Sequence, residues 1–313
     1  MHELVQRILS GDKRAAARAI THIENDAPQK HDILRDLHPH TGRAYLVGLT
    51  GSPGAGKSSL TDRIITYLRK ELGMRVGVIA VDPTSPFTGG AILGDRVRMG
   101  AHALDPDVFI RSMGTRGSLG GLARTTQEAL RVLDAWGCEV ILIETVGVGQ
   151  SELDIMNVAD STVVVLNPSA GDHIQTMKAG IMEIADLFVI NKADLPGTDK
   201  TDREVSNMLD LMGHVPWRPP VTRTISRDNK GIPEFWSKVQ EHESYLRSSG
   251  VWEQRRHKRR QDEVVAIIEG QMTRRLKELM HGDAAWSSKI AQVEQGAVDP
   301  YTIADEMIGK LLK

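Results

Sequence analysis

The sequence contains very little cysteine and few aromatic residues, and it lacks any long apolar run. Cys138 is the single cysteine among 313 residues, so no disulfide can form within the chain, and the composition is typical of a protein from a reducing compartment. No apolar stretch reaches the roughly 18 residues that a transmembrane helix needs, and the first residues lack the apolar core of a signal peptide. We therefore predict a cytoplasmic protein with no membrane partner.

A large excess of either charge is also absent. The chain has 39 basic and 41 acidic residues, whereas proteins that bind nucleic acid or membrane surfaces carry a basic excess. One local exception is the basic run R-R-H-K-R-R at 255–260, which Glu253, Asp262 and Glu263 flank. Nucleic-acid contact there stays open, but a solvated helix face or a salt-bridged interface is the favoured interpretation. We predict no nucleic-acid partner.

What the sequence does contain is a phosphate-binding motif, G-x-x-x-x-G-K-S. It lies between an apolar run at 44–49 and an amphipathic run at 60–72, and strand, glycine-rich loop and helix are the context of a P-loop. Backbone N–H groups of such a loop face the phosphates, Lys57 contacts the β and γ oxygens, and the Ser58 hydroxyl binds Mg²⁺. The predicted phosphate-binding residues are Gly51, Ser52, Pro53, Gly54, Ala55, Gly56, Lys57, Ser58 and Ser59.

A second motif predicts which base is bound. Asn191, Lys192, Ala193 and Asp194 follow the apolar run L-F-V-I at 187–190. The Asp194 carboxylate can accept hydrogen bonds from N1–H and the exocyclic amine of guanine, a donor pair that adenine lacks. Behind a P-loop, this N-K-x-D pattern predicts GTP and GDP as ligands.

Acidic residues follow two further segments. Asp82 directly follows a predicted strand at 76–81. A parallel sheet would bring it near the P-loop, where it would bind Mg²⁺ through a water. An ordinary Asp-Pro turn is the alternative. Asp95 lies in the glycine-containing stretch 88–99 with Arg96 and Arg98. That stretch is either a nucleotide-sensing switch or a solvated charged loop.

The third acid, Glu144, directly follows a predicted strand at 140–143. Glu144 to Gly147 stands where GTPases usually carry D-x-x-G, so Glu144 would hold Mg²⁺ through a water and the Gly147 N–H would sense the γ-phosphate. Val148 follows, where Ras-like proteins have a water-orienting glutamine. We therefore expect slow intrinsic hydrolysis, or a catalytic carboxylate supplied from elsewhere.

Six segments in this order and spacing resemble the MeaB/ArgK GTPases, from about residue 40 to 235. They are V-G-L-T-G-S-P-G-A-G-K-S, V-D-P-T-S-P, G-D-R-V-R-M, R-S-M-G-T-R-G-S-L-G-G, E-T-V-G-V-G-Q-S-E and N-K-A-D. The resemblance implies a G-protein chaperone of an adenosylcobalamin-dependent methylmalonyl-CoA mutase. It also implies that Lys57 and Ser58 bind phosphate and Mg²⁺, and that Asn191, Lys192 and Asp194 form the guanine site. The acids around the metal, which together with Lys57 are the expected catalytic residues, are Asp82, Asp95 and Glu144.

One segment departs from the family pattern. The family usually has Ser-Ala before a K/R-G-I signature, where it supplies a backbone N–H to guanine O6. Here Ile225 and Ser226 precede K-G-I at 230–232. A backbone contact does not require a particular side chain, so we keep Ile225, Ser226 and Arg227 as predicted base-site residues.

The predicted fold is α/β, a P-loop NTPase with a mostly parallel central sheet and helical extensions at both ends. We expect an N-terminal helical extension at 1–40, the GTPase domain at 41–235 and a C-terminal helical dimerisation region at 236–313. An apolar stripe between 264 and 280 is too broad for an isolated solvated helix, which predicts a homodimer. His38 and His40 flank Pro39, either as half a metal site or, as we favour, as solvated residues.

Three functions remain open from the sequence. The favoured one is a GTP-hydrolysing chaperone that gates an adenosylcobalamin-dependent acyl-CoA mutase. A metallochaperone GTPase is the second, although a Cys/His cluster for its metal is missing from the sequence. The third is a P-loop kinase of small molecules, for which we find no acceptor pocket or catalytic base.

Overall fold

A computed structural model describes most of the chain. The described residues are 1–82, 100–114, 124–145, 154–168, 179–213, 215–282 and 284–311. They form two compact units, Met1–Trp252 and Glu253–Lys313. Asp95, Gly147 and Val148 lie outside the described residues, as does the stretch 88–99 that contains Asp95.

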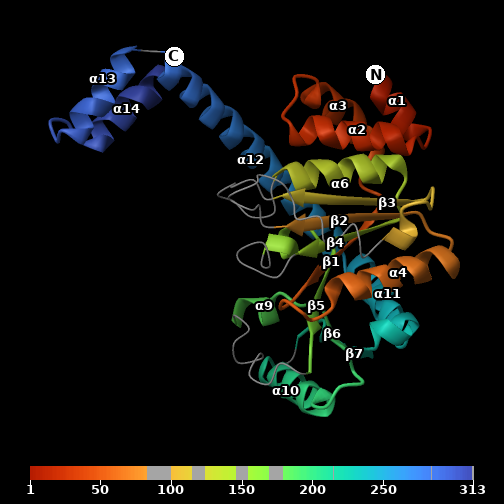
Figure 1. Cartoon of the computed structure of the whole chain (residues 1–313). Coiled ribbons are helices and arrows are strands. Elements are labelled where there is room, and N and C mark those ends of the chain that lie inside the picture. The colour runs from red at the N-terminus through yellow and green to blue at the C-terminus, as the bar shows by residue number, and fades with distance from the viewer. Residues whose placement is uncertain are drawn as a thin grey trace. The chain divides into compact units, whose positions relative to one another are not determined.

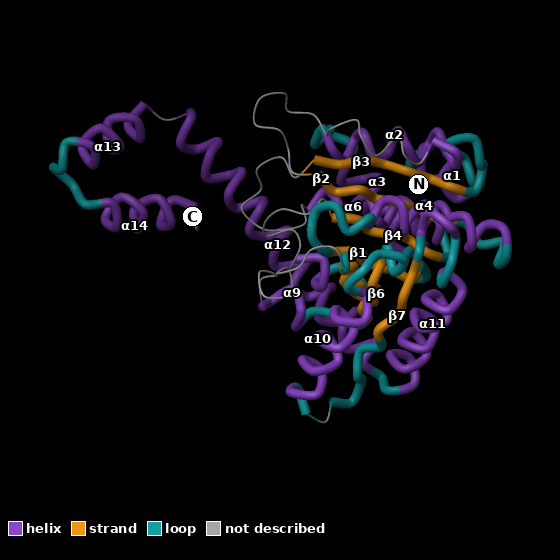
Figure 2. Tube along the Cα trace, turned by 60° about the horizontal axis from the view of Figure 1, so that its bottom comes forward, coloured by secondary structure: helices purple, strands orange, loops and turns teal. Residues whose placement is uncertain are grey.

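A seven-stranded parallel sheet organises the first unit (Figures 1 and 2). In chain order the strands are β1 (Tyr45–Thr50), β2 (Val76–Asp82), β3 (Val108–Gly114), β4 (Val140–Thr145), β5 (Ser161–Leu166), β6 (Leu187–Asn191) and β7 (Val221–Thr224), and in space they run β3-β2-β4-β1-β5-β6-β7. Every residue of β4, β5 and β6 is buried, which explains why these strands are nearly continuous apolar runs rather than alternating ones. The predicted α/β fold with a mostly parallel sheet is confirmed.

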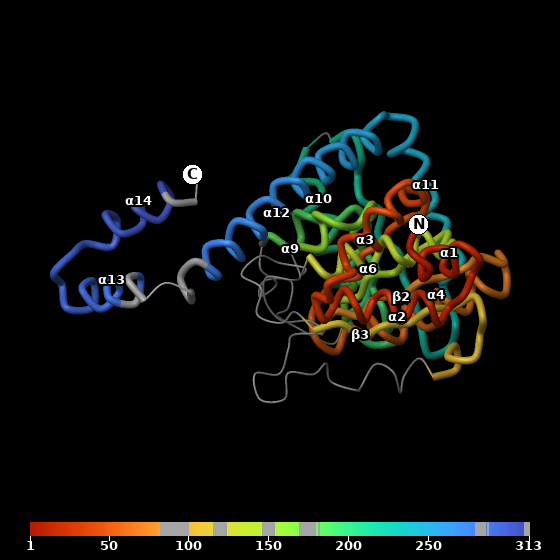
Figure 3. The backbone as a smooth tube through the Cα atoms, turned by 90° about the horizontal axis from the view of Figure 1, so that it is seen from above, coloured from red at the N-terminus to blue at the C-terminus, as the bar shows by residue number. Residues whose placement is uncertain are grey.

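Helices cover both faces of this sheet. On one face, α6 (Arg124–Trp136) lies against the strands, and α1 (Glu3–Leu9), α2 (Lys13–Glu24) and α3 (Lys30–Leu37) pack on α6 as a further layer (Figures 1 and 3). On the other face lie α4 (Lys57–Lys70) and α11 (Ile232–Ser248). Beside β6 and β7 lie α9 (Ala179–Glu183) and α10 (Thr198–Leu211). The 3-10 helices are η1 (His38–His40), η2 (Gly100–His102), η3 (Ile155–Asn157) and η4 (Ser226–Asp228).

The N-terminal helices have short apolar faces that they can bury, and α2 also begins at a capping residue. α2 contributes four fully buried side chains to an apolar core that it shares with α6: Ala16, Ala19, Ile20 and Ile23. Asp12 is the N-cap of α2, and its Oδ1 accepts the backbone N–H groups of Arg14 at 2.8 Å and Ala15 at 3.1 Å. The N-terminal extension is therefore packed on the domain through a continuous apolar core.

In the described part of the second unit, the regular structure is helical. It contains most of α12 (Val251–Gly282), with α13 (Ala284–Glu294) and α14 (Pro300–Leu311). Leu276 packs with a small apolar cluster of Trp286, Ile303 and Met307. Upstream on α12, by contrast, four large apolar side chains are about half exposed: Val264, Val265, Ile268 and Met272. Among the described helices, none has the length and hydropathy required to cross a bilayer.

Candidate functional site: a P-loop pocket at the carboxyl edge of the sheet

The P-loop begins where β1 ends, and its shape depends on glycine. Gly51, Gly54 and Gly56 have φ angles of 136°, 78° and 89°, a region that other residues rarely adopt. A Cβ on Gly51 would stand 2.2 Å from the Val165 carbonyl oxygen, and one on Gly56 would stand 2.5 Å from Asn191 Nδ2. Gly56 is also the N-cap residue of α4, so the loop leads directly into a helix N-terminus, which favours anions.

Lys57 spans this loop from the first position of α4. Its side chain is buried, and Nζ donates to the carbonyl oxygens of Gly51 at 2.5 Å and Ser52 at 3.2 Å. The ammonium is therefore held against the backbone of the loop, beside the start of α4. A buried cation beside a helix N-terminus is an arrangement that binds phosphate oxygens.

Glu144 connects β4 to the same helix. The β1–β4 register places it opposite Leu49, next to the start of the P-loop, and it is only 1% exposed. Its Oε1 accepts the Ser58 hydroxyl at 2.6 Å, and its Oε2 lies 3.0 Å from Thr61 Oγ1. Thr61 Oγ1 is also 3.0 Å from the Lys57 carbonyl oxygen, and its single proton can serve one acceptor at a time.

These groups fit a magnesium ion chemically. A buried carboxylate and a hydroxyl within 2.6 Å of each other are hard oxygen donors, and Mg²⁺ takes few protein ligands, completing its shell with phosphate and water. Asp82 ends β2 opposite Gly114, at the same edge of the sheet, but its side chain lies outside the described part of the chain. Within the described residues, no cluster of three or more His, Cys, Asp or Glu side chains is arranged to hold a metal.

Asn191 joins the P-loop to the loop after β7. It is the last residue of β6 and is 1% exposed. Its Nδ2 donates to the carbonyl oxygens of Ala55 at 3.1 Å and Gly56 at 3.3 Å. Its Oδ1 accepts the hydroxyls of Thr224 at 3.1 Å and Ser226 at 2.9 Å. Asn191 therefore ties the end of β6 to the P-loop and to the loop after β7.

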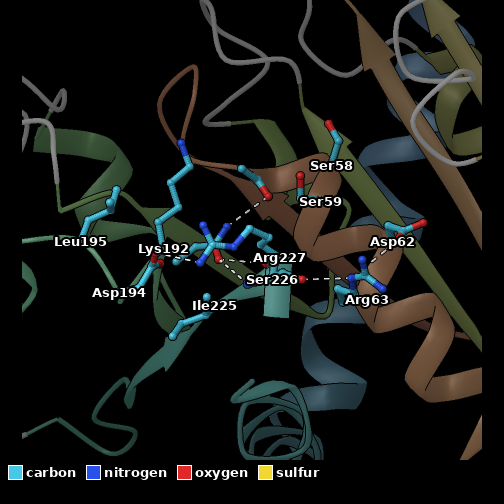
Figure 4. Close-up of a pocket in the computed structure, with 12 residues that line it drawn as sticks. Ser58, Ser59, Asp62, Arg63, Lys192, Asp194, Leu195, Ile225, Ser226 and Arg227 are labelled. Carbon is cyan, nitrogen blue, oxygen red and sulfur yellow. Dashed lines mark hydrogen bonds and ion pairs between the residues drawn. The ribbon is translucent and has the colours of Figure 1, made fainter. Parts of the chain in front are cut away.

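The remaining base-site candidates line one pocket of about 490 Å³ (Figure 4), a size typical of small-ligand sites. Lys192 crosses to the P-loop, where its Nζ donates to the Gly54 carbonyl oxygen at 2.9 Å. Asp194 lies at the same pocket, and Arg227 Nη2 is 3.4 Å from its Oδ2. The pKa of Arg227 is raised, mainly by its hydrogen bond with Asp228 and to a smaller extent by the negative charges of Asp228 and Asp194.

The full lining includes residues that the sequence motifs did not predict. The lining residues are Gly56, Ser58, Ser59, Asp62, Arg63, Asn191, Lys192, Asp194, Leu195, Ile225, Ser226 and Arg227. Asp62 and Arg63 come from the second turn of α4, outside the G-x-x-x-x-G-K-S pattern. Thr61, which contacts Glu144, was also missed, although its position three residues after Ser58 on a helix puts both hydroxyls on one face.

Together, the fold and this pocket define a P-loop nucleotide-binding protein: a helix N-terminus after β1, a buried lysine, a carboxylate facing the P-loop serine and an N-K-x-D loop at one edge of a parallel sheet. Comparisons with known proteins narrow this class. The family described as "Methylmalonyl Co-A mutase-associated GTPase MeaB" matches residues 16–281. The chain belongs to this family of GTPases, as its resemblance to MeaB/ArgK proteins predicted, and guanine nucleotide is the ligand that membership implies.

Individual relatives match 80% or more of the chain. A Pyrococcus abyssi protein, named provisionally as a GTPase, is 51% identical over 315 residues, covering 99% of this chain and 96% of its own. The GTPase ArgK of Escherichia coli is 35% identical over 263 residues, covering 80% of this chain and 78% of its own. The crystal structure of a LAO/AO transport system kinase matches with a TM-score of 0.72 at 25% identity, covering 99% of this chain and 97% of that one.

Proposed function

We propose that this protein binds and hydrolyses GTP and, as a chaperone, gates the assembly or protection of an adenosylcobalamin-dependent acyl-CoA mutase of the methylmalonyl-CoA mutase type. One observation carries the nucleotide part: Asn191 hydrogen-bonds both to the P-loop and to the 225–227 loop, which joins the phosphate and base segments into one site. The partner part is supported by the family, whose description names methylmalonyl-CoA mutase. The protein would act in the cytoplasm as a homodimer, with no nucleic-acid or membrane partner.

Phosphate binding would fall to the P-loop and Lys57. The helix N-terminus at Gly56 and the buried ammonium favour the same β and γ oxygens. Ser58 and Glu144 would hold Mg²⁺, with Asp82 and Asp95 as further acids, and the ion would neutralise charge that develops on the phosphates. Because Glu144 accepts the Ser58 hydroxyl at 2.6 Å, it orients that hydroxyl at the edge of the pocket.

Base recognition would fall to Asp194, Lys192 and the 225–227 loop. The Asp194 carboxylate accepts the two donors on the Watson–Crick edge of guanine, and a backbone N–H of the loop meets O6. Lys192 lies over the P-loop with its Nζ on Gly54, so its aliphatic stem is available to the purine face. Guanine is thereby distinguished from adenine by charge-assisted hydrogen bonds that adenine cannot complete.

Hydrolysis would be slow without a partner, because Val148 cannot orient the attacking water. Unassisted P-loop GTPases turn over at about 10⁻⁴ to 10⁻² s⁻¹, and partners accelerate them by orders of magnitude. The test is phosphate release from GTP by the protein alone and with the mutase of its host. A turnover above about 10 s⁻¹ for the protein alone would contradict this mechanism.

A small-molecule kinase is a second candidate, favoured by the match to a crystal structure titled as a transport system kinase. The same phosphate site would then transfer the γ-phosphoryl group to an acceptor rather than to water. Incubation with radiolabelled GTP or ATP separates the two. Label that appears only as inorganic phosphate supports the GTPase, and label on an added acceptor or on a carrier protein supports the kinase.

A further inference from the structure

An arginine of the P-loop helix holds the loop that is expected to contact the base. Arg63, in the second turn of α4, donates from Nε to the Ser226 carbonyl oxygen at 3.0 Å, across 163 positions of sequence (Figure 4). Ser226 is 4% exposed, so it is fixed in the interior of the site. Asp62 supports the arginine, since its Oδ2 lies 3.8 Å from Arg63 Nε, and His102 Nε2 in turn lies 3.1 Å from Asp62 Oδ1.

Ser226 is held from two sides at once. Its carbonyl oxygen accepts from Arg63, while its backbone N–H and its hydroxyl donate to Asn191 Oδ1 at 3.3 and 2.9 Å. The hydroxyl is present because serine stands at the second position of the pair where the family usually has alanine. The departure from the family pattern therefore adds a hydrogen bond that an alanine could not make.

These contacts link three segments that line the pocket. Asn191 Nδ2 returns to the Gly56 carbonyl oxygen at 3.3 Å, and Gly56 leads directly into α4, which carries Arg63. The P-loop helix, the N-K-x-D strand end and the 225–227 loop are thus each bonded to the other two. A displacement of Ser226 would have to break either the arginine contact or the asparagine contact.

We propose that Arg63 is a positioning residue for guanine recognition, acting through Ser226. It keeps the 225–227 loop at the distance from the P-loop at which a backbone N–H meets the O6 carbonyl of the base. This inference rests on the proposed function, because it assumes that guanine occupies the pocket. It assigns to Arg63 a role in base affinity and none in the phosphate chemistry.

The test compares Arg63→Gln with ligands that differ in one feature. Affinities of the full chain are measured for GTP, for ITP, which keeps O6 but lacks the 2-amine, and for tripolyphosphate, which has no base. Because the Arg63 hydrogen bond is charge-assisted but the side chain is 38% exposed, we expect GTP and ITP to weaken equally, by about 3- to 10-fold. Tripolyphosphate affinity should stay the same.

Two further variants separate this role from a structural one. Arg63→Lys keeps a donor and should recover part of the GTP affinity, whereas Ser226→Ala removes the hydroxyl and should weaken GTP and ITP together. Lys70→Gln removes a positive charge from the exposed last turn of the same helix and should change nothing. Unchanged GTP affinity in Arg63→Gln, or an equal loss for tripolyphosphate, would overturn the proposal.

An Asp194→Asn control distinguishes failure of the inference from failure of the proposed function. ITP lacks the amine that Asp194 would accept, so this variant should weaken GTP more than ITP. If Asp194→Asn shows that loss while Arg63→Gln behaves like Lys70→Gln, the positioning role is wrong and the guanine site stands. If Asp194→Asn has no effect on GTP, the guanine site itself is wrong.

Discussion

Gly56 and Asn191 illustrate how closely single residues of the site depend on one another. A side chain on Gly56 would overlap Asn191 Nδ2, which is the atom that donates to the carbonyl oxygens of Ala55 and Gly56. The glycine therefore serves two purposes. It allows the left-handed backbone at the N-cap of α4, and it leaves space for the Asn191 side-chain amide, which connects the end of β6 to the P-loop. Substituting it would disturb the phosphate and base segments together.

The Asp194 carboxylate is the residue on which base choice should depend. Asp194→Asn exchanges one acceptor for an amide donor that opposes the donors of guanine, while xanthine offers the complementary acceptor. We expect GTP affinity to fall by about 1.5–3 kcal/mol for the lost charge-assisted pair, with a further cost for the unpaired groups, and affinity for xanthine nucleotides to rise. Titration with GTP and XTP measures both, and a variant that binds GTP as tightly as the wild type would remove the guanine assignment.

Lys57 should be required for phosphate binding. Lys57→Ala removes the buried ammonium that spans Gly51 and Ser52, so we expect hydrolysis to be abolished and GTP affinity to fall at least about tenfold, as for the loss of a charged hydrogen-bond partner. Lys70→Ala, at the exposed end of the same helix, is the matched control. Hydrolysis that persists in Lys57→Ala at the wild-type rate would contradict the role given to the P-loop.

At the scale of elements, a buried polar network joins α11 to the amino ends of β1 and β5. The hydroxyls of Tyr45 and Ser161 lie 2.6 Å apart, Ser161 Oγ lies 2.5 Å from His242 Nδ1, and the Tyr45 ring stacks on Trp252. His242 is fully buried. This network is at the edge of the sheet opposite the P-loop, and it connects the last helix of the α/β fold to the first turn of α12.

That network predicts a loss of stability in alkali. Burial raises the pKa of Tyr45 above its ordinary value, with the Ser161 hydrogen bond acting in the opposite direction. The folded state therefore retains the tyrosine proton more strongly than the unfolded state. The contribution of this difference to the free energy of unfolding is complete below a pH of about 10 and is lost as the pH rises beyond it. Urea unfolding between pH 8 and 11 measures the effect.

Two phenylalanine variants isolate the contribution of Tyr45. Tyr45→Phe should show a smaller decrease of unfolding free energy with pH than the wild type, the difference approaching about 1.4 kcal/mol per pH unit at most for a single group. Tyr301→Phe, whose tyrosine is 82% exposed, should follow the wild-type slope. Identical slopes for all three proteins would show that Tyr45 titrates as it does in the unfolded chain.

For the molecule as a whole, the C-terminal helices are expected to form the dimer interface. Val264, Val265, Ile268 and Met272 of α12 are about half exposed, and burying four such side chains in a partner interface would be favourable by the hydrophobic effect. We expect the full chain to sediment as a dimer and a chain ending after Trp252, the last residue of the first compact unit, to be monomeric. A dimeric truncated chain would place the interface elsewhere.

Nucleotide state and mutase binding should be linked. A ligand shifts a conformational equilibrium only through its different affinities for the two states, so GTP and GDP forms must bind the mutase differently if the nucleotide gates assembly. By reciprocity, the mutase must change the protein's affinity for nucleotide by the same factor. Calorimetry of the mutase against each nucleotide form measures this coupling, and equal affinities for the two forms would end the gating proposal.

Much of this protein is encoded in contiguous stretches. The apolar runs before Gly51 and before Asn191 predict buried parallel strands, and the motifs that follow them predict where phosphate and base would bind, because the carboxyl ends of parallel strands meet at one edge. Such features depend on local periodicity and on turn chemistry, which a chain carries wherever it folds.

Other features arise only when distant segments are brought together. Nothing near Arg63 in the sequence indicates that it contacts Ser226, 163 positions away. The residues around Glu144 likewise do not indicate that its carboxylate contacts both Ser58 and Thr61. The packing of α1–α3 on α6 is of the same kind. Side-chain contacts of this sort are set by strand order and by the packing of helices on the sheet, and these depend on burial summed over the whole core rather than on any one segment.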